Sequence, residues 1–198
     1  MSKFDNVKKN LEAKGYVVKE FATALEAGKY LDTQIDGVVV GIGGSATVLA
    51  SGAYDLLSKH NEVHWHWKSD DQTAERMDSM KADVYLTSTN AITENGEMMN
   101  IDGTGNRVAG MLYGHKKVYY LITPNKIVSD LAAAYEHVRK YCGPIRSKQL
   151  NRKTPCVVDG ICHDCNSPER ICNGMNILLR PMGGMPAEVL LIDEELGI

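Results

Sequence analysis

The chain lacks the features that mark membrane proteins and nucleic-acid-binding proteins. No apolar stretch approaches the roughly 20 residues that span a bilayer, and the start of the sequence, MSKFDNVKKNLEAKG, has no apolar segment typical of a signal peptide. No block of lysine and arginine exceeds two residues, and the formal net charge is −3. These absences argue against a membrane partner and against broad binding of nucleic acids.

Cysteine is scarce and odd in number. The chain has five cysteines in 198 residues, so a framework made only of disulfide bonds would leave one thiol unpaired. A reducing, cytoplasmic location fits this count better, and clustered cysteines in such a location are typical of metal ligands or redox centres. The length suits one substantial domain with a small appendage.

Two kinds of apolar pattern alternate along most of the chain. Short runs rich in β-branched residues predict strands, and apolar residues spaced three and four apart predict helices. The predicted strands cover residues 16–18, 37–40, 64–67, 83–86, 118–122 and 187–193. The predicted helices cover residues 2–14, 22–31, 46–59, 71–80 and 127–141. This alternation predicts an α/β fold with a mainly parallel sheet.

The pattern changes at Cys142. Residues 142–186 are rich in Cys, Gly, Pro and Arg and show little periodicity. We interpret this segment as a cysteine-rich insertion before the last strand, or as a small C-terminal lobe packed on the sheet. Both interpretations leave residues 1–198 as a single domain.

A glycine-rich loop, GIGGSAT at residues 41–47, joins a predicted strand to a predicted helix. Glycines at such a turn let backbone N–H groups approach an anion, and the hydroxyl groups can add further donors. The spacing matches neither the dinucleotide-binding motif nor a Walker A loop, and a tight turn with an ordinary helix cap is the alternative. Ligands of α/β sheets bind at the carboxyl ends of strands, which favours anion binding here. The candidate residues are Gly41, Gly43, Gly44, Ser45 and Thr47.

Residues 87–107, TSTNAITENGEMMNIDGTGNR, form an unusually polar segment. Its Asn-Gly pair at residues 95–96 predicts a hairpin between residues 90–93 and 98–101. Arg107 is suited to a bidentate grip on a carboxylate or phosphate, and Asp102 and Asn106 join it as ligand-binding candidates. Glu94 is the candidate catalytic residue, as a nucleophile or a general base.

GIGGSAT followed by TNAITENGEMMNIDGTGNRVAGMLYGHKKVYYLITPNKIV resembles the LUD family, the lactate-utilisation proteins of the LutC and YkgG kind, over roughly residues 3–195. The resemblance implies a Rossmann-like open sheet of the NagB/RpiA/CoA transferase-like kind, with the glycine loop and the acidic turn beside the active site. Lys126 lies in a matching element and joins the ligand-binding candidates. TENG at residues 93–96 is similar to the S-E-N-G element that carries the glutamate nucleophile of some CoA transferases.

A cysteine run near the C-terminus has the pattern C-x5-C-x2-C-x6-C, which is the kind of donor set that a soft metal centre needs. Structural zinc usually pairs two C-x2-C elements, and only one is present. The uneven spacing favours an iron–sulfur cluster, [4Fe–4S], over zinc or over cysteines without a metal. The run resembles that of a shorter LUD subgroup, and typical lactate-utilisation members lack it. The predicted metal ligands are Cys156, Cys162, Cys165 and Cys172.

The motif HWHW at residues 64–67 has the spacing of a metal-ligand pair. No third ligand is evident, so we interpret it as a strand with histidines on one face and tryptophans on the other.

Two functions follow from these observations. The first is a LUD-type protein that holds an iron–sulfur centre and a small anionic metabolite, in redox or organic-acid metabolism. The alternative is a non-redox enzyme of the isomerase or CoA-transferase type, with structural zinc or no metal, or an accessory subunit. Whether the chain is an enzyme stays open, as does its assembly into a homo-oligomer or with a redox partner protein.

Overall fold

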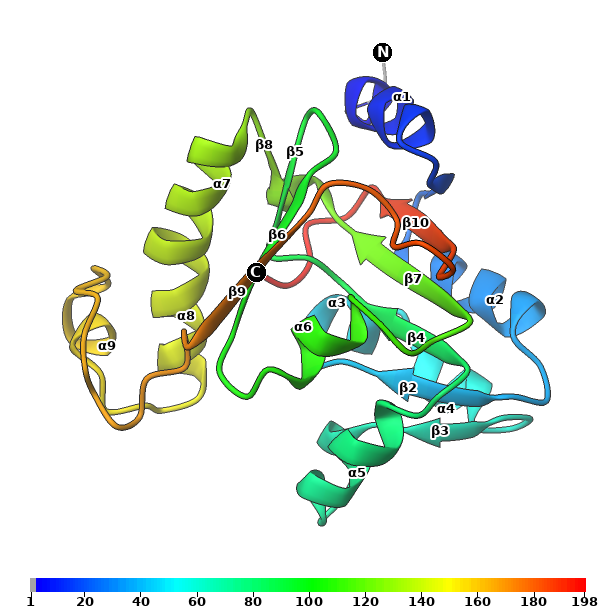
Figure 1. Cartoon of the computed structure of the whole chain (residues 1–198), viewed down its shortest axis with the longest axis horizontal. Coiled ribbons are helices and arrows are strands. Elements are labelled where there is room, and N and C mark those ends of the chain that lie inside the picture. Colours follow the sequence, from blue (N-terminus) through cyan, green and yellow to red (C-terminus); the bar gives the residue numbers. More distant parts are fainter. Residues whose placement is uncertain (1–2) are drawn as a thin grey trace.

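Two sheets form the framework of residues 3–198, the part of the chain that the computed structural model describes (Figure 1). The larger sheet has six parallel strands, in the order β1 (Val17–Phe21), β10 (Ala187–Ile192), β7 (Lys117–Ile122), β4 (Val84–Thr87), β2 (Val39–Ile42) and β3 (Glu62–His64). The smaller sheet has four strands, in the order β8 (Ile127–Val128), β5 (Ala91–Thr93), β6 (Met98–Asp102) and β9 (Gly174–Leu178). The prediction of an α/β fold with an open parallel sheet is confirmed.

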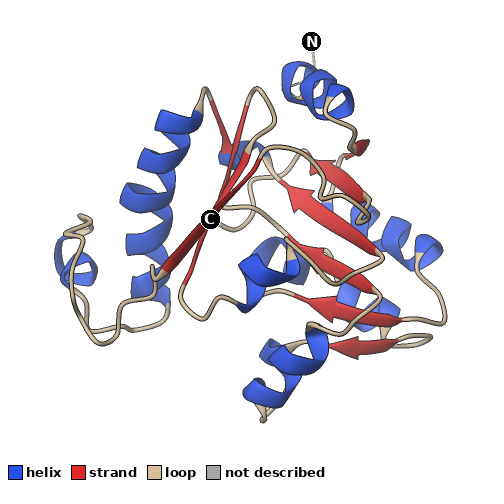
Figure 2. Cartoon of the chain, in the orientation of Figure 1, coloured by secondary structure: helices blue, strands red, loops and turns tan. Residues whose placement is uncertain are grey.

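Helices cover both sheets (Figure 2). The α-helices are α1 (Asp5–Ala13), α2 (Ala24–Gln34), α3 (Ala46–Ala50), α4 (Ala53–Leu57), α5 (Gln72–Ser79), α6 (Asn106–Gly110), α7 (Leu131–Glu136), α8 (Gly143–Gln149) and α9 (Pro155–Asp159). Two 3₁₀ turns, η1 (His66–Lys68) and η2 (Pro124–Lys126), and a π-helical segment, η3 (His137–Cys142), complete the set. Within residues 3–198, no helix combines the length and the apolar character needed to cross a bilayer.

The apolar strands bury side chains on both faces of the larger sheet. In β10, Val189 and Leu191 belong to one buried cluster, and Leu190 and Ile192 belong to another on the opposite face. This alternation follows from the two-residue period of a strand, and it explains why every residue of β10 is buried.

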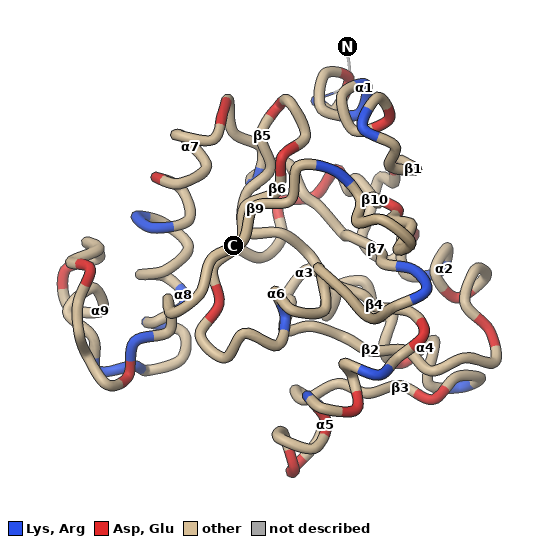
Figure 3. Tube along the Cα trace, viewed as in Figure 1, with Lys and Arg blue, Asp and Glu red and all other residues tan. Residues whose placement is uncertain are grey.

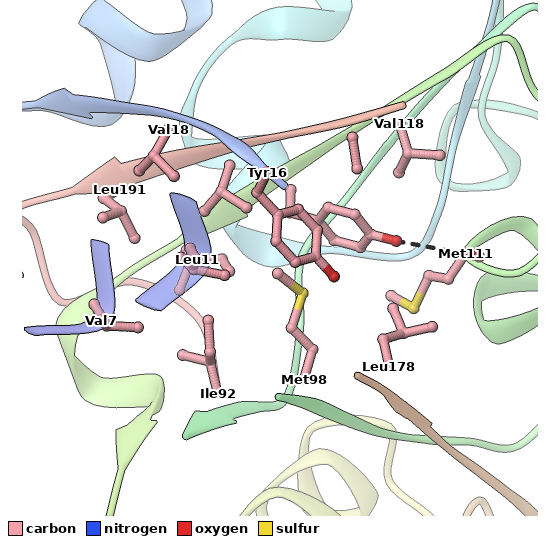
Figure 4. Packing of buried hydrophobic residues seen from close by; sticks show 14 of the residues in the cluster. Val7, Leu11, Tyr16, Val18, Ile92, Met98, Met111, Val118, Leu178 and Leu191 are labelled. Atoms are coloured by element: carbon pink, nitrogen blue, oxygen red, sulfur yellow. Dashed lines mark hydrogen bonds between the residues drawn. The ribbon is translucent and has the colours of Figure 1, made fainter. Parts of the chain in front are cut away.

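The first of these clusters also joins the two sheets and α1. Leu11 of α1 packs with Tyr16, with Ile92 and Met98 of the β5–β6 hairpin, and with Leu178 of β9 (Figure 4). Each of these side chains is buried, and full burial of such a side chain contributes about 1.5–3 kcal/mol. The smaller sheet is therefore held against the larger one by apolar packing.

Two predicted elements near the glycine loop differ from the structure. The helix predicted for residues 46–59 divides into α3 and α4 at Gly52, which has a φ of 67°. The strand predicted for residues 64–67 ends at His64, and η1 begins at His66. Trp65 and Trp67 stack on each other with ring centroids 5.3 Å apart, although His66 to Lys68 form a 3₁₀ turn and not a strand.

The helical segment before the cysteines also differs from its prediction. The helix predicted for residues 127–141 begins only at α7, where the side chain of Asp130 accepts a hydrogen bond from the backbone of Ala133. It does not end at Cys142 but continues into α8, with Pro144 in the first turn, where proline is tolerated. The predicted beginning of α1 at Ser2 lies outside the described residues.

Residues 142–186 contain more regular structure than their composition indicates. Besides α8 and α9, they contribute β9, which pairs with β6 along its whole length and so adds a strand to the smaller sheet. Figure 1 shows α9 and its flanking loops at the edge of the molecule, beyond α8. The part that projects is thus shorter than the predicted cysteine-rich segment.

Gly28 of α2 offers a test of helix packing on the larger sheet. A Cβ atom added at Gly28 would lie 1.9 Å from the main-chain oxygen of Ser51. We expect Gly28→Ala to lower the free energy of unfolding by about 1–3 kcal/mol through overpacking. This expectation opposes the intrinsic preference of helices for alanine, which is worth about 1 kcal/mol.

Chemical denaturation would measure this difference. Gly174→Ala is the matched control, because a Cβ atom there meets no other atom within 4 Å. A Gly28→Ala protein as stable as the wild type would contradict the close contact between α2 and Ser51.

Candidate functional site

A cavity of about 400 Å³ opens at the carboxyl ends of the parallel strands. The residues that follow β2, β4, β7 and β10 all contribute to its wall, which is where α/β sheets place ligands. The opposite wall comes from α5, from α6 and from the helix that leads through Cys142 into α8. The cavity thus lies between the larger sheet and the segment that carries the cysteines.

Six of the nine predicted ligand-binding residues line this cavity. They are Gly44, Ser45, Asp102, Asn106, Arg107 and Lys126. The glycine loop and the acidic turn therefore lie at one site, although ligand binding itself stays a prediction.

The other three predicted residues do not line the cavity. A Cβ atom at Gly41 would lie 2.4 Å from the main-chain oxygen of Ser79, and one at Gly43 would lie 2.8 Å from the hydroxyl of Tyr85. These two glycines permit close packing of β2 against its neighbours. Thr47 is fully buried and donates to the main-chain oxygen of Leu196 at 3.4 Å.

Arg107 lies at the cavity, but its guanidinium group is bound to other parts of the protein. It makes four hydrogen bonds of 2.7–3.3 Å and an ion pair of 3.5 Å. The acceptors are the main-chain oxygens of Ser88 and Ile101 and the side-chain oxygens of Asn90, Asn100 and Asp102. Since every nitrogen of the guanidinium group has a partner, Arg107 fixes the site rather than offering free donors to a ligand.

The charges that face the cavity are unbalanced. Four other basic side chains contribute to its wall, and none of them forms an ion pair with a side-chain carboxylate in the described part of the chain. They are Arg76, Lys126, Arg146 and Arg152. Asp102 is the acidic side chain of the lining, and it already pairs with Arg107. Basic positions beside α6 and around α8 and α9 are visible in Figure 3.

Arg146 is held in a defined position at this wall. Its guanidinium carbon lies 5.2 Å from the ring centroid of Trp67, within the range of a cation–π contact. Trp67 in turn packs against Gly44, where an added Cβ atom would lie 3.3 Å from the indole ring. The HWHW motif therefore builds part of the cavity, through an arrangement that its strand-like pattern does not predict.

His66 also lines the cavity and is almost completely buried. Within residues 3–198, its Nδ1 atom has no hydrogen-bond partner. Burial, reinforced by Arg76, lowers the pKa of His66 to about 4, so the ring is neutral at pH 7. A neutral imidazole can donate or accept one hydrogen bond with a ligand.

Glu94 does not point into the cavity, contrary to its predicted catalytic role. It is exposed and does not contribute to the lining, and its carboxylate accepts a hydrogen bond of 3.0 Å from Asn6. The reason is local, because Glu94 directly precedes the hairpin turn at Gly96 and projects toward α1 at the far end of the hairpin. A general base must reach hydrogen-bond distance of its substrate, so Glu94 in this position could not act on a ligand held in this cavity.

All five cysteines are free. Cys142 is buried at the cavity wall, and burial raises the pKa of its thiol to about 11. Cys172 also lines the cavity, and Cys162 accepts a hydrogen bond of 3.5 Å from Arg139. Across residues 3–198, no three His, Cys, Asp or Glu side chains are arranged as metal ligands. The predicted convergence of the four clustered cysteines is thus not seen in this arrangement, although the donor types suit a soft metal.

Comparisons with known proteins place the chain in a family. No curated protein matches it. Its fold is similar to the crystal structure of a DUF162 family protein from Deinococcus radiodurans, with 13% sequence identity and a TM-score of 0.52. That likeness covers 97% of this chain and 99% of the other. A family model of the LUD domain matches residues 4–192, so the chain belongs to the LUD domain family, as its sequence resemblance predicts.

Proposed function

We propose that the cavity binds a small organic anion, a carboxylate or a phosphate ester, in organic-acid metabolism. The observation that carries this proposal is the surplus of basic side chains. Arg76, Lys126, Arg146 and Arg152 face the cavity without a side-chain carboxylate as partner in the described residues, whereas Asp102 is neutralised by Arg107.

Electrostatics and hydrogen bonding both favour an anion here. Positive charges that lie close together repel one another, and a bound anion offsets this repulsion. Arginine can bind a carboxylate or phosphate through two parallel hydrogen bonds. Burial and the neighbouring Arg107 already lower the pKa of Arg146, which indicates that this guanidinium lacks a compensating negative charge.

We predict that Arg146→Gln weakens anion binding about 10-fold or more, because a hydrogen bond to a charged group is worth about 1.5–3 kcal/mol. Calorimetric titration with inorganic phosphate, lactate and pyruvate would measure the affinity. Binding should also weaken as the salt concentration rises, because added ions screen the charges.

Arg180→Gln is the control for this experiment. Arg180 is exposed and lies outside the cavity lining, and its substitution removes the same charge from the protein. Equal effects of the two substitutions, or no binding of any of the three anions to the wild type, would contradict the proposal.

We also propose that the cysteine segment binds a soft metal, with an iron–sulfur cluster favoured and zinc as the alternative. Four free thiols lie within residues 156–172, and the structure leaves none of them fully buried. Arg139 and Arg170 both contact Asp164 and also bond to atoms of the cysteines, so positive charge is available to offset thiolates. The side chains would have to draw together on binding, since they form no metal-ligand group as they stand.

Protein purified without oxygen should contain iron and sulfide and absorb visible light if the cluster is present. Zinc without visible absorption would support the alternative.

Cys162→Ser should lower both the metal content and the stability, because metal affinity and folding are linked. Cys142→Ser is the control for the metal content, since Cys142 lies outside the segment. Protein whose thiols are all reduced but which contains neither iron nor zinc in stoichiometric amount would rule out this second proposal.

A further inference from the structure

Lys126 is the most unusual charged residue of the cavity. It follows β7 in the turn η2, lines the cavity, and has a side chain that is only 2% exposed. Lysine is almost never fully buried unless it is paired, because removing an ammonium group from water is costly. No carboxylate side chain of residues 3–198 forms an ion pair with Lys126.

The surroundings of Lys126 make its ammonium group easier to deprotonate. Burial is the main cause that lowers its pKa, to about 8, and Arg107 lowers it further. Cys142 opposes this effect only as a thiolate, and its own pKa of about 11 keeps it a neutral thiol at pH 7. The imidazole of His137 lies close to Lys126. Burial lowers the pKa of His137, and the charge of Lys126 lowers it further. With such a pKa, about a tenth of the amine is neutral at pH 7, which is far more than in an exposed lysine.

Lys126 donates a hydrogen bond to a residue that also lines the cavity. Its Nζ atom donates to the main-chain oxygen of Ile198 at 3.2 Å, and Asn125 donates to that of Gly197, also at 3.2 Å. Residues 197 and 198 themselves form part of the cavity wall. Lys126 is therefore the donor of this pair that reaches the cavity, whereas Asn125 is not part of its lining.

We propose that the amine of Lys126 is a nucleophile that forms an imine with the carbonyl group of a small 2-oxo acid bound in the cavity. The inference rests on the proposed anion site, because the basic side chains would hold the carboxylate of such a ligand. A 2-oxo acid combines the two groups that this cavity suits, an anion and an electrophilic carbonyl carbon. The ammonium form, which predominates at pH 7, can attract the carboxylate, and the neutral fraction of the amine supplies the nucleophile.

The step is balanced without an oxidant or a reductant. The lone pair of Nζ attacks the carbonyl carbon, and the nitrogen loses a proton while the carbonyl oxygen gains one, which gives a carbinolamine. Loss of water then breaks the carbon–oxygen bond and leaves the imine. The imine withdraws electrons from the adjacent carbon, so the reaction class it serves is the making or breaking of a bond at that carbon.

Borohydride trapping tests the inference on the full-length protein. The protein is incubated with glyoxylate or pyruvate, reduced with borohydride, digested and analysed by mass spectrometry. Hydride reduction converts an imine into a stable secondary amine, so Lys126 should carry the added carboxyalkyl group at low ligand concentration. The exposed lysines in the same digest, such as Lys81 and Lys116, serve as internal controls and should stay unmodified.

Two variants separate imine formation from ion binding. Lys126→Arg keeps a positive charge, so it should still bind inorganic phosphate but give no trapped adduct. Lys126→Met removes both the charge and the nucleophile and should lose the adduct as well. Thermal unfolding shows whether either variant is folded, and trapping on the wild type gives a result even if both variants are unstable.

The outcomes distinguish this inference from the proposed function. Wild-type protein that binds pyruvate in calorimetry but yields no adduct at Lys126 would overturn the imine and leave the anion site standing. An adduct spread evenly over exposed lysines would overturn it as well. Wild-type protein that binds neither phosphate nor 2-oxo acids would overturn both.

Discussion

The guanidinium group of Arg107 fixes the two sheets relative to each other, and the cavity depends on this arrangement. Its partners come from the end of β4, the beginning of β5 and the end of β6, which is where the larger sheet passes into the smaller one. Burying this charge costs several kcal/mol, and the hydrogen bonds with the ion pair to Asp102 offset that cost. The same amide groups also bind the backbone, as Asn90 accepts from the N–H of Ile101 at 3.0 Å. The polar segment that looks like a ligand site in the sequence is therefore largely the joint between the sheets.

Much of the fold could be predicted because its signals are local. The apolar runs of β7 and β10 are buried on both faces, so period and composition agree with their positions. The turn at Gly96, with a φ of 87°, needs a conformation that glycine adopts readily, and the hairpin was predictable from it. The location of the site also follows from the sequence, since parallel strands bring their carboxyl ends to one edge.

The roles of individual side chains depend on contacts between distant segments, which local patterns do not contain. Arg107 looks free in the sequence because its acceptors lie up to 19 residues away. Trp67 contacts Arg146 because the helix at Cys142 continues into α8. Gly143 and Pro144 predict the end of a helix at this point, so the sequence does not indicate the contact. Glu94 is predicted to be catalytic from a short motif, but it is exposed and lies outside the cavity lining. A short motif does not determine the direction of a side chain. Lys126 could be named from the sequence, but its burial and the lack of an Asp or Glu partner among the described residues could not.

The position of β10 has a consequence for how the chain folds. Val17 of the first strand pairs with Glu188 of the last, and β10 lies between β1 and β7. During synthesis, β1 therefore has no neighbour in the larger sheet until β10 has left the ribosome. Contacts between residues so far apart in sequence make folding slow and leave a strand edge exposed meanwhile. Completion of the larger sheet is thus a late event in folding, which depends on the pairing of β1 with β10.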